Sequence, residues 1–296
     1  MKIAVTGANS SVGQNLIAHI LIRGNHEVIA GVRSLASLKD LPVDSRIEPR
    51  VIRYDDVDGL AEAISGADSV VHLAGILIES KQSNYQTANV DATEAVIKAA
   101  RKAKAKHLVF VSVVGANSDS SNPYFRSKGQ AEKLVEQSGL SASILRTPIL
   151  LGPGTAGALS LVGAASQARV GILGGGHYQM QPLDVNDLST AILRCCGTPN
   201  PGAKCFELVG PETVSYRDLV TRVAGLMGKN VAIKSIPIWM AKLGAAVNSR
   251  IKGGGITPAV IDVITQGEKV AHNSDDALGI TLTPLNETLE KIVNQS

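Results

Sequence analysis

The chain has 296 residues, of which 44% are hydrophobic and 19% are charged, as is ordinary for a globular protein. Its 29 Lys and Arg residues nearly balance its 26 Asp and Glu residues, so the net charge of +3 gives no indication of nucleic-acid binding. This length accommodates one large α/β domain, or a domain with a smaller lobe. These properties are typical of a soluble, enzyme-sized protein.

Cysteine and histidine usage indicates no metal site. The three cysteines, Cys195, Cys196 and Cys205, form no Cys-x-x-Cys pair, and the six histidines are scattered. The chain opens with strand-like sequence, which leaves no room for a signal peptide, so we expect a cytoplasmic location. The weakly charged stretch from Thr147 to Asp184 contains two prolines near its start and many glycines, and we therefore expect no membrane span.

The first 33 residues carry the strongest signal. They predict a buried strand over Ile3–Thr6, a turn over Gly7–Gly13, a helix over Gln14–Arg23 and a second strand over Glu27–Val32. Such a turn directs helix N–H groups and the positive end of the helix dipole toward an anion. In an α/β sheet this anion is usually the pyrophosphate of a dinucleotide. The sequence therefore predicts that the chain binds NAD or NADP.

The turn places Gly7, Ser10 and Gly13 three residues apart. Gly7 allows the tight exit from the strand, and Gly13 lets the helix approach the sheet. Ser10 occupies the position of a middle glycine, where its hydroxyl could donate to a phosphate oxygen. With Ser11 and Val12, which follow at the start of the helix, these residues form the predicted phosphate site.

The residues at the end of the second strand indicate which of the two nicotinamide cofactors is bound. A carboxylate near this position would bind the ribose 2′-hydroxyl of NAD. The strand instead ends in Ala-Gly-Val-Arg, without an acid, and Arg33 offers a planar guanidinium suited to a 2′-phosphate. NADP is therefore expected rather than NAD.

Strands and helices alternate as far as residue 150. The following strands are expected at 46–54, 69–74, 108–114 and 142–147, with helices at 57–64, 84–103 and 123–137. The run SVVHLA at Ser69–Ala74 is continuously apolar apart from its ends and His72, as in a strand buried on both faces. This alternation predicts an α/β fold, a doubly wound parallel Rossmann sheet, over residues 1–150.

The pattern changes after Pro148, where glycine-rich turns separate short elements. Helices are expected at 156–168, 238–247, 258–266 and 286–294, with another opened by Ser215, and strands at 205–209 and 231–236. We expect residues 151–296 to form a smaller substrate lobe, with some segments returning to the main sheet. The small and aliphatic helix at 156–168 could pack in a core, line an apolar cleft or face a partner.

Tyr124 and Lys128 form the candidate catalytic pair. Asn122 and Pro123 are typical of a helix start, and residues four apart lie on one helix face. Such a pair suits acid–base chemistry on a carbonyl or alcohol. Lowering the pKa of a tyrosine from about 10 to about 7 takes roughly 4 kcal/mol. A neighbouring ammonium and a nicotinamide cation could supply this in a partly desolvated site.

Several motifs, taken in order, resemble one enzyme family. They are TGANSSVG (6–13), HLAG (72–75), NVDAT (89–93), YFRSK (124–128) and LRTPILLGPG (145–154). The chain resembles an extended or atypical short-chain dehydrogenase/reductase, a group with NAD-dependent epimerase- and dehydratase-like members. More narrowly, it is similar to the group that includes the nucleotide-binding accessory subunit of respiratory complex I.

The resemblance implies roles for individual residues. Tyr124 would be the acid–base, and Lys128 would bind the nicotinamide ribose and lower the pKa of the tyrosine. Ser112 would orient the substrate oxygen, and Asn89 would support a proton relay. In the remaining cofactor site, Asp56, or its neighbour Asp55, would contact adenine; Ala74 and Gly75 would lie under the adenine side, and Pro148 near the nicotinamide.

Three functions remain open from the sequence. The first is an NADP(H)-dependent oxidoreductase acting on a carbonyl or alcohol of a small molecule; the apolar stretch after Gly152 hints at a lipophilic substrate or a protein surface. The second is a sugar-nucleotide epimerase or dehydratase. The third is a sensor or assembly protein that holds NADPH without turnover, because the family's paired serines are replaced by Ser112-Val113. A protein partner or a homo-oligomer is also open.

Overall fold

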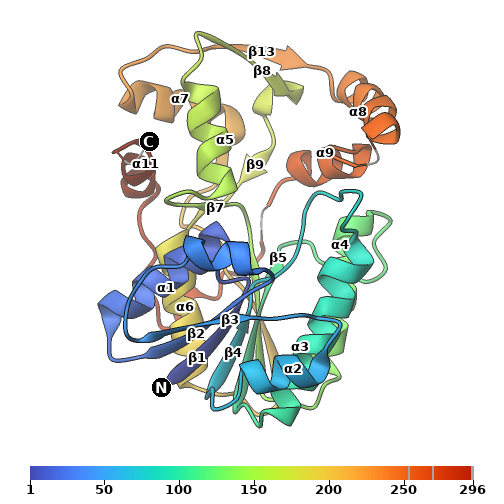
Figure 1. Ribbon diagram of the computed structural model, residues 1–296. Helices are drawn as coiled ribbons and strands as arrows, with labels where there is room; N and C mark the ends of the chain where they lie inside the picture. Colours follow the sequence, from blue (N-terminus) through green and yellow to red (C-terminus); the bar gives the residue numbers. More distant parts are fainter. Residues whose placement is uncertain (253, 269, 295–296) are drawn as a thin grey trace.

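The computed structural model describes residues 1–252, 254–268 and 270–294. Its lower part is a twisted sheet between two layers of helices, and a smaller lobe of helices and short strands lies over one end of that sheet (Figure 1). The chain enters this lobe after β6 and returns to the sheet before its C-terminal part.

The central sheet has seven strands in the order β3-β2-β1-β4-β5-β6-β11, and every pair is parallel. The strands are β1 (Lys2–Thr6), β2 (Glu27–Val32), β3 (Ile47–Val51), β4 (Ser69–His72), β5 (His107–Val113), β6 (Ala142–Thr147) and β11 (Ala203–Glu207). The strand order reverses between β1 and β4, which creates a crevice at the carboxyl ends of the strands. The predicted doubly wound parallel sheet is confirmed.

Helices cover both faces of the sheet. One face carries α1 (Ser11–Arg23) and α6 (Val185–Gly197), and the other carries α2 (Val57–Ala63), α3 (Ala92–Lys102) and α4 (Pro123–Glu136). Each face of the sheet has its own hydrophobic core, and successive residues of β4 point into different cores. Val71 packs in the core on the α1 side, and Val70 packs in the core on the side of α2, α3 and α4. This two-sided burial explains why the strand sequence is apolar without alternation.

The helix expected over 84–103 begins with a π-helical turn, Gln86–Asp91 (η2), before α3. The N–H of Ala92 bonds to the carbonyl of Thr87, five residues earlier, in place of the usual four. Such a turn changes the direction of side chains at the helix start. Asn89, at its centre, is buried.

The upper lobe contains the helices expected after residue 150, together with one short helix and several short strands that no periodicity indicated. Its helices are α5 (Ala156–Ala165), α7 (Tyr216–Leu226), α8 (Ile238–Lys252), α9 (Pro258–Thr265), α10 (Asp275–Leu278) and α11 (Leu285–Asn294). Its short strands pair as β8 (Arg169–Leu173) with β13 (Ala232–Ile236), β7 (Leu150–Leu151) with β10 (Leu183–Asp184), and β9 (Gln179–Met180) with β12 (Val214–Ser215). Two 3₁₀ turns complete the chain, η1 (Leu35–Asp40) after β2 and η3 (Gly174–Gly176) after β8.

The lobe has its own core, in which Leu161 of α5, Leu219 of α7 and Leu289 of α11 are buried together. The expected helix over 156–168 ends at Ala165, because the chain then turns into β8. Among the described residues, no helix is long and apolar enough to cross a membrane, and no group of His, Cys, Asp or Glu could hold a metal ion.

Helix α4 lies unusually close to the loop that follows β5. A Cβ atom at Gly129 would overlap the backbone of Asn117 and Ser118. The loop is tied back to the helix by the N–H of Asn117, which donates to the carbonyl of Phe125 at 3.1 Å. This packing sets the position of the first turn of α4, where Tyr124 lies.

We expect Gly129→Ala to destabilise the fold by at least about 2 kcal/mol, because backbone on both sides has no room to move apart. Gly163→Ala is the matched control, since a Cβ on that glycine of α5 meets nothing within 4 Å. The control should be neutral or stabilising by up to about 1 kcal/mol, through helix propensity. Urea unfolding followed by circular dichroism measures both. Equal effects would contradict the close packing.

Candidate active site

A cavity of about 490 Å³ lies at the carboxyl edge of the sheet, between the sheet and the upper lobe. It brings together seven residues that the sequence analysis selected: Ser11, Val12, Gly75, Ser112, Tyr124, Lys128 and Pro148. They come from α1, from α4 and from the ends of β4, β5 and β6. The other selected residues are absent from this lining.

The turn between β1 and α1 is held close to the end of β4. Gly7 has a φ of +81°, and a Cβ there would lie 3.2 Å from the backbone nitrogen of Ala74. At Gly13, a Cβ would lie 2.5 Å from the carbonyl oxygen of Gly7 and 2.7 Å from that of Ala8. Only glycine fits these positions without movement of the backbone. The N-terminus of α1 therefore faces the crevice at short range.

Ser10 has a different role from the one expected. Its hydroxyl donates to the carbonyl of Gly7 at 2.7 Å and accepts from the N–H of Gly13 at 3.0 Å, so it is the N-cap of α1. Since its proton is already used, it does not face a phosphate as a donor. Ser11 and Val12 follow in the first helical turn, where N–H groups lack intrahelical acceptors, and both line the cavity. Their backbone fits a pyrophosphate.

Arg33 and Asp56 follow the ends of β2 and β3 and are exposed. Asp56 is the N-cap of α2 and accepts from the N–H of Gly59 at 2.9 Å. Its neighbour Asp55 is paired with Arg53, at 2.7 Å between Nη2 and Oδ2. Both candidates for the adenine-side contact thus lie at the same sheet edge, on the side of β2 and β3.

Tyr124 lies in the first turn of α4, where the Asn122 side chain accepts from its N–H at 3.0 Å. Burial raises the pKa of Tyr124 above its usual value, and the charges of Tyr85 and Glu268 add to this. This direction is opposite to the lowering expected from Lys128, because burial is the largest cause of the shift. The phenol therefore stays protonated at neutral pH, ready to donate.

Lys128 is buried one helical turn further along α4. Its Nζ donates to the carbonyl of Val111 at 3.0 Å and lies 4.4 Å from the centroid of the Phe110 ring. Burial lowers the pKa of Lys128 to about 8. A single carbonyl satisfies one of the three ammonium hydrogens, so the group can bind further acceptors in the cavity.

Ser112 lies near the end of β5, and its Oγ is buried without a hydrogen-bond partner in the protein. A buried hydroxyl left in this state costs about 1–3 kcal/mol. The backbone around it is fixed, since Thr147 Oγ1 donates to the Ser112 carbonyl at 3.2 Å. The orphaned hydroxyl in the cavity wall is available to a bound carbonyl oxygen.

Asn89 is tied to the cavity wall by all of its polar atoms. Its Oδ1 accepts from the N–H of Ile76 at 2.8 Å, and its Nδ2 donates to the Ile76 carbonyl at 3.2 Å and to Ser127 Oγ at 2.9 Å. Ser127 in turn donates to the carbonyl of Tyr124 at 2.8 Å. Both amide hydrogens are used, so Asn89 acts as a positioning residue for the loop after β4 and for α4.

A buried histidine supports Asn89 from below. His72 Nδ1 lies 2.7 Å from Thr6 Oγ1, and its Nε2 lies 3.2 Å from Thr93 Oγ1. Because Thr93 donates its own proton to the Asn89 carbonyl at 2.6 Å, Nε2 of His72 carries the hydrogen and Nδ1 accepts. Burial, and then the charge of Lys128, lower the pKa of His72 to about 3. The ring is neutral.

Sequence reasoning did not select the cavity residues that come from the upper lobe. Among them are Tyr178, Tyr216 and Glu268. The rings of Tyr178 and Tyr216 are stacked, with centroids 5.8 Å apart and an interplanar angle of 15°. They lie far apart in the chain, so no local pattern in the sequence connects them.

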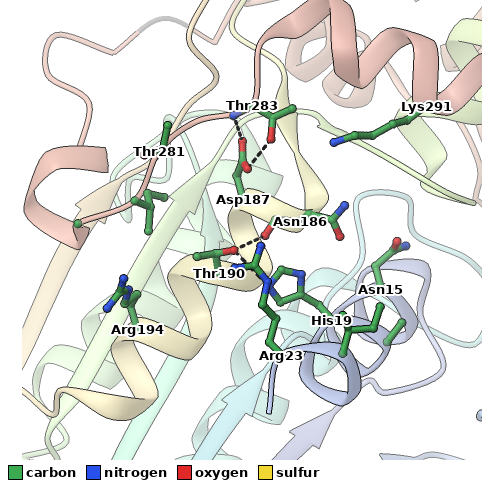
Figure 2. A pocket seen from close by; sticks show the side chains of 14 residues that line it. Asn15, His19, Arg23, Asn186, Asp187, Thr190, Arg194, Thr281, Thr283 and Lys291 are labelled. Carbon is green, nitrogen blue, oxygen red and sulfur yellow. Dashed lines mark hydrogen bonds between the residues drawn. The ribbon is translucent and has the colours of Figure 1, made fainter.

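A second cavity, of about 550 Å³, lies between α1, α6 and the segment before α11, and contains none of the selected residues (Figure 2). Asp187 points to Thr283 there and accepts from its N–H at 2.7 Å and its hydroxyl at 2.8 Å (Figure 2). Nearby, Asp184 accepts from Thr288 at 2.9 Å and from Lys291 at 3.0 Å. These contacts fasten the C-terminal helix to α6, which is a structural role.

The neutral state of His72 predicts acid sensitivity. The folded pKa is about 3 against an ordinary 6.5, so the unfolded chain binds a proton that the folded chain excludes. The stability is present above pH 6.5 and is lost as pH falls toward 3, by about 1.4 kcal/mol per pH unit from this group. His72→Gln should remove about one proton from the number taken up on unfolding, and the slope of the unfolding free energy against pH should fall accordingly. The same change at the exposed His177 should leave the slope unchanged. Urea unfolding at pH 7, 6 and 5 measures the slope.

Comparisons with known proteins identify the family and the fold. Residues 7–171 match the family model described as NAD(P)H-binding. A ketoreductase from Stigmatella aurantiaca, named for 4-hydroxy-2-methyl-3-oxo-4-farnesyl-3,4-dihydroquinoline-1-oxide, is 26% identical over 94% of this chain and 90% of its own length. Mitochondrial NADH dehydrogenase [ubiquinone] 1 alpha subcomplex subunit 9 from Dictyostelium discoideum is 25% identical over 74% of this chain and 62% of its own.

Among solved structures, UDP-glucuronic acid 4-epimerase from Bacillus cereus in complex with NAD has a TM-score of 0.79 at 17% identity. The match covers 100% of this chain and 98% of that one, so the two share the fold. The family model spans more than half of the chain, from the glycine turn to β8. The protein therefore belongs to the NAD(P)H-binding family, as its resemblance to the extended and atypical short-chain dehydrogenase/reductases predicted.

Proposed function

We propose that the protein is an NADP(H)-dependent reductase that acts on a ketone or aldehyde group of small lipophilic molecules. The observation that carries this proposal is the shared cavity of Ser11, Ser112 and Tyr124. This cavity is lined by the N-terminus of α1, which suits the dinucleotide, by the unpartnered hydroxyl of Ser112 and by the protonated phenol of Tyr124. The likeness to a ketoreductase whose named substrate carries a farnesyl group supports it.

The residues present fit the cofactor. The amides of Ser11 and Val12 would hold the pyrophosphate, and Arg33 would pair with the 2′-phosphate of NADP. Lys128 would bind the nicotinamide ribose with its remaining ammonium hydrogens, beside Gly75 and Pro148 of the cavity wall. When bound, the reduced cofactor supplies the hydride that reaches the carbonyl carbon.

The chain's own residues would control the carbonyl oxygen. Ser112 Oγ would donate a hydrogen bond to it, and Tyr124 would transfer its phenolic proton to it as the carbon is reduced. The raised pKa of Tyr124 favours this direction, because the phenol is protonated before the reaction. The nearby ammonium of Lys128 would stabilise the negative charge left on the tyrosine.

The lining of the cavity disfavours a sugar nucleotide. A diphosphate is usually bound by Arg or Lys, and Lys128 is the single basic residue among the described residues of the lining. Its ammonium hydrogens would be shared between the Val111 carbonyl and the nicotinamide ribose. Apolar side chains such as Ile76, Leu77 and Val114 cover much of the remaining wall. An apolar substrate without a diphosphate agrees better with these contacts.

NADPH should bind at least about ten-fold more tightly than NADH, because a charge-assisted contact to the 2′-phosphate contributes over 1 kcal/mol. Arg33→Ala should remove the difference. Arg222→Ala is a suitable control, since Arg222 pairs with Glu212 in the upper lobe. Calorimetric titration with both cofactors measures the preference. Equal affinities in the unmodified protein would show that NADP is not selected.

Tyr124→Phe should lower kcat for NADPH-dependent ketone reduction by about a hundred-fold or more, because the proton donor is lost. Ser112→Ala should lower it by about ten-fold or more, through the lost hydrogen bond. Both variants should keep their NADPH affinity. NADPH oxidation at increasing concentrations of apolar ketones provides the assay. Tight NADPH binding without reduction of any ketone would favour the non-catalytic alternative.

A further inference from the structure

Among the described residues that line the reaction cavity, Glu268 is the single acidic one. The residue as a whole is half-buried, but its Oε2 is fully covered and has no hydrogen-bond partner. A covered carboxylate oxygen without a partner is costly to keep. Among the described residues, no cation acts on this carboxyl group, and the cavity's Lys128 donates to the Val111 carbonyl instead.

The backbone fixes this carboxyl group in place. The N–H of Glu268 donates to the carbonyl of Gln179 at 3.0 Å, beside β9. Gly267 has a φ of +85°, and a Cβ there would lie 3.0 Å from the same carbonyl. The chain thus turns sharply after α9 and places Glu268 at the cavity in a defined position.

Helix α9 brings this turn over the catalytic tyrosine. Val263 packs against the aromatic cluster of Tyr85, Tyr124 and Phe125. The helix is also tied to the start of α4, because Asn122 Nδ2 donates to the Ala259 carbonyl at 2.9 Å. The position of Glu268 is therefore coupled to that of the reacting groups.

The electrostatics agree with this placement. The charge of Glu268 contributes to the raised pKa of both Tyr124 and Tyr178, so the carboxyl group acts on both sides of the cavity. Burial raises the pKa of Glu268 itself to about 7, partly offset by the Ile149 amide. The cavity lining also includes the apolar Met180, Val263 and Ile264, and Oε2 has no hydrogen-bond partner in the protein.

We infer that Glu268 binds a hydroxyl group of the substrate, so that the substrate class is an apolar ketone or aldehyde with a hydroxyl on the arm that lies toward α9. The hydroxyl would donate to the carboxyl group of Glu268, and a rotation of that group would turn Oε2 from its covered position toward this partner. The apolar wall and the stacked Tyr178–Tyr216 pair would hold the hydrocarbon part. This inference rests on the proposed function, since it takes the cavity as the substrate site.

The test measures binding separately from turnover. In the presence of saturating NADP⁺, which cannot reduce a ketone, 2-undecanone and its monohydroxylated derivatives are titrated calorimetrically into the protein. At pH 8, where Glu268 is mostly ionised, at least one derivative should bind about ten-fold more tightly than 2-undecanone, as expected for a hydrogen bond to a charged group. Glu268→Leu should remove this advantage and leave 2-undecanone binding within about two-fold, because an apolar side chain of similar size replaces the acid.

Glu290→Leu, at an exposed acid of α11, is the matched control and should change neither affinity. Circular dichroism and NADPH affinity check that each variant is folded. The inference is overturned if no hydroxylated derivative binds better than the parent ketone, or if Glu268→Leu retains the preference. A Glu268-dependent preference without NADPH oxidation would support the inference and refute the reductase function instead.

Discussion

Close backbone contact at the carboxyl edge of the sheet is the constraint on which the site depends. Gly13 lets α1 approach the turn after β1, and Gly129 lets α4 approach the loop after β5. A methyl group at either position would overlap main chain, which cannot rotate away as a flexible side chain can. The first contact directs the N–H groups of α1 toward the crevice, and the second sets Tyr124 opposite them.

Beneath this edge, a buried polar network holds the reacting groups without adding charge. Thr6, His72, Thr93 and Asn89 are connected in series by hydrogen bonds, and Asn89 continues through Ser127 to the backbone of Tyr124. The His72 ring stacks on Phe110, with centroids 5.7 Å apart, and Lys128 lies over that same ring. A neutral histidine beside a buried lysine avoids a second positive charge in a medium where repulsion is strong. The network therefore stabilises one geometry of the site.

The upper lobe supplies the features that distinguish this cavity from a plain dinucleotide site. Tyr178, Tyr216 and Glu268 face the reaction edge from segments that follow β8, β12 and α9. The lobe is attached to the sheet through polar contacts at Asp184 and Asp187, which bind the C-terminal segment to α6. The lobe is thus anchored at both ends, at β7 and at α11.

The sequence by itself determined the sheet and the cofactor end of the site. Apolar strand runs, the glycine turn and the helix start at Asn122-Pro123 are local signals, in which each residue's backbone preference and burial period act within a few neighbours. Tertiary structure alone decided the rest. The Ser10 hydroxyl caps α1 instead of facing a phosphate, and burial raises the pKa of Tyr124 against the expected effect of Lys128. Glu268 reaches the cavity through pairing with β9, far away in the chain. Burial, pKa and such contacts arise from neighbours distant in sequence, and no local pattern encodes them.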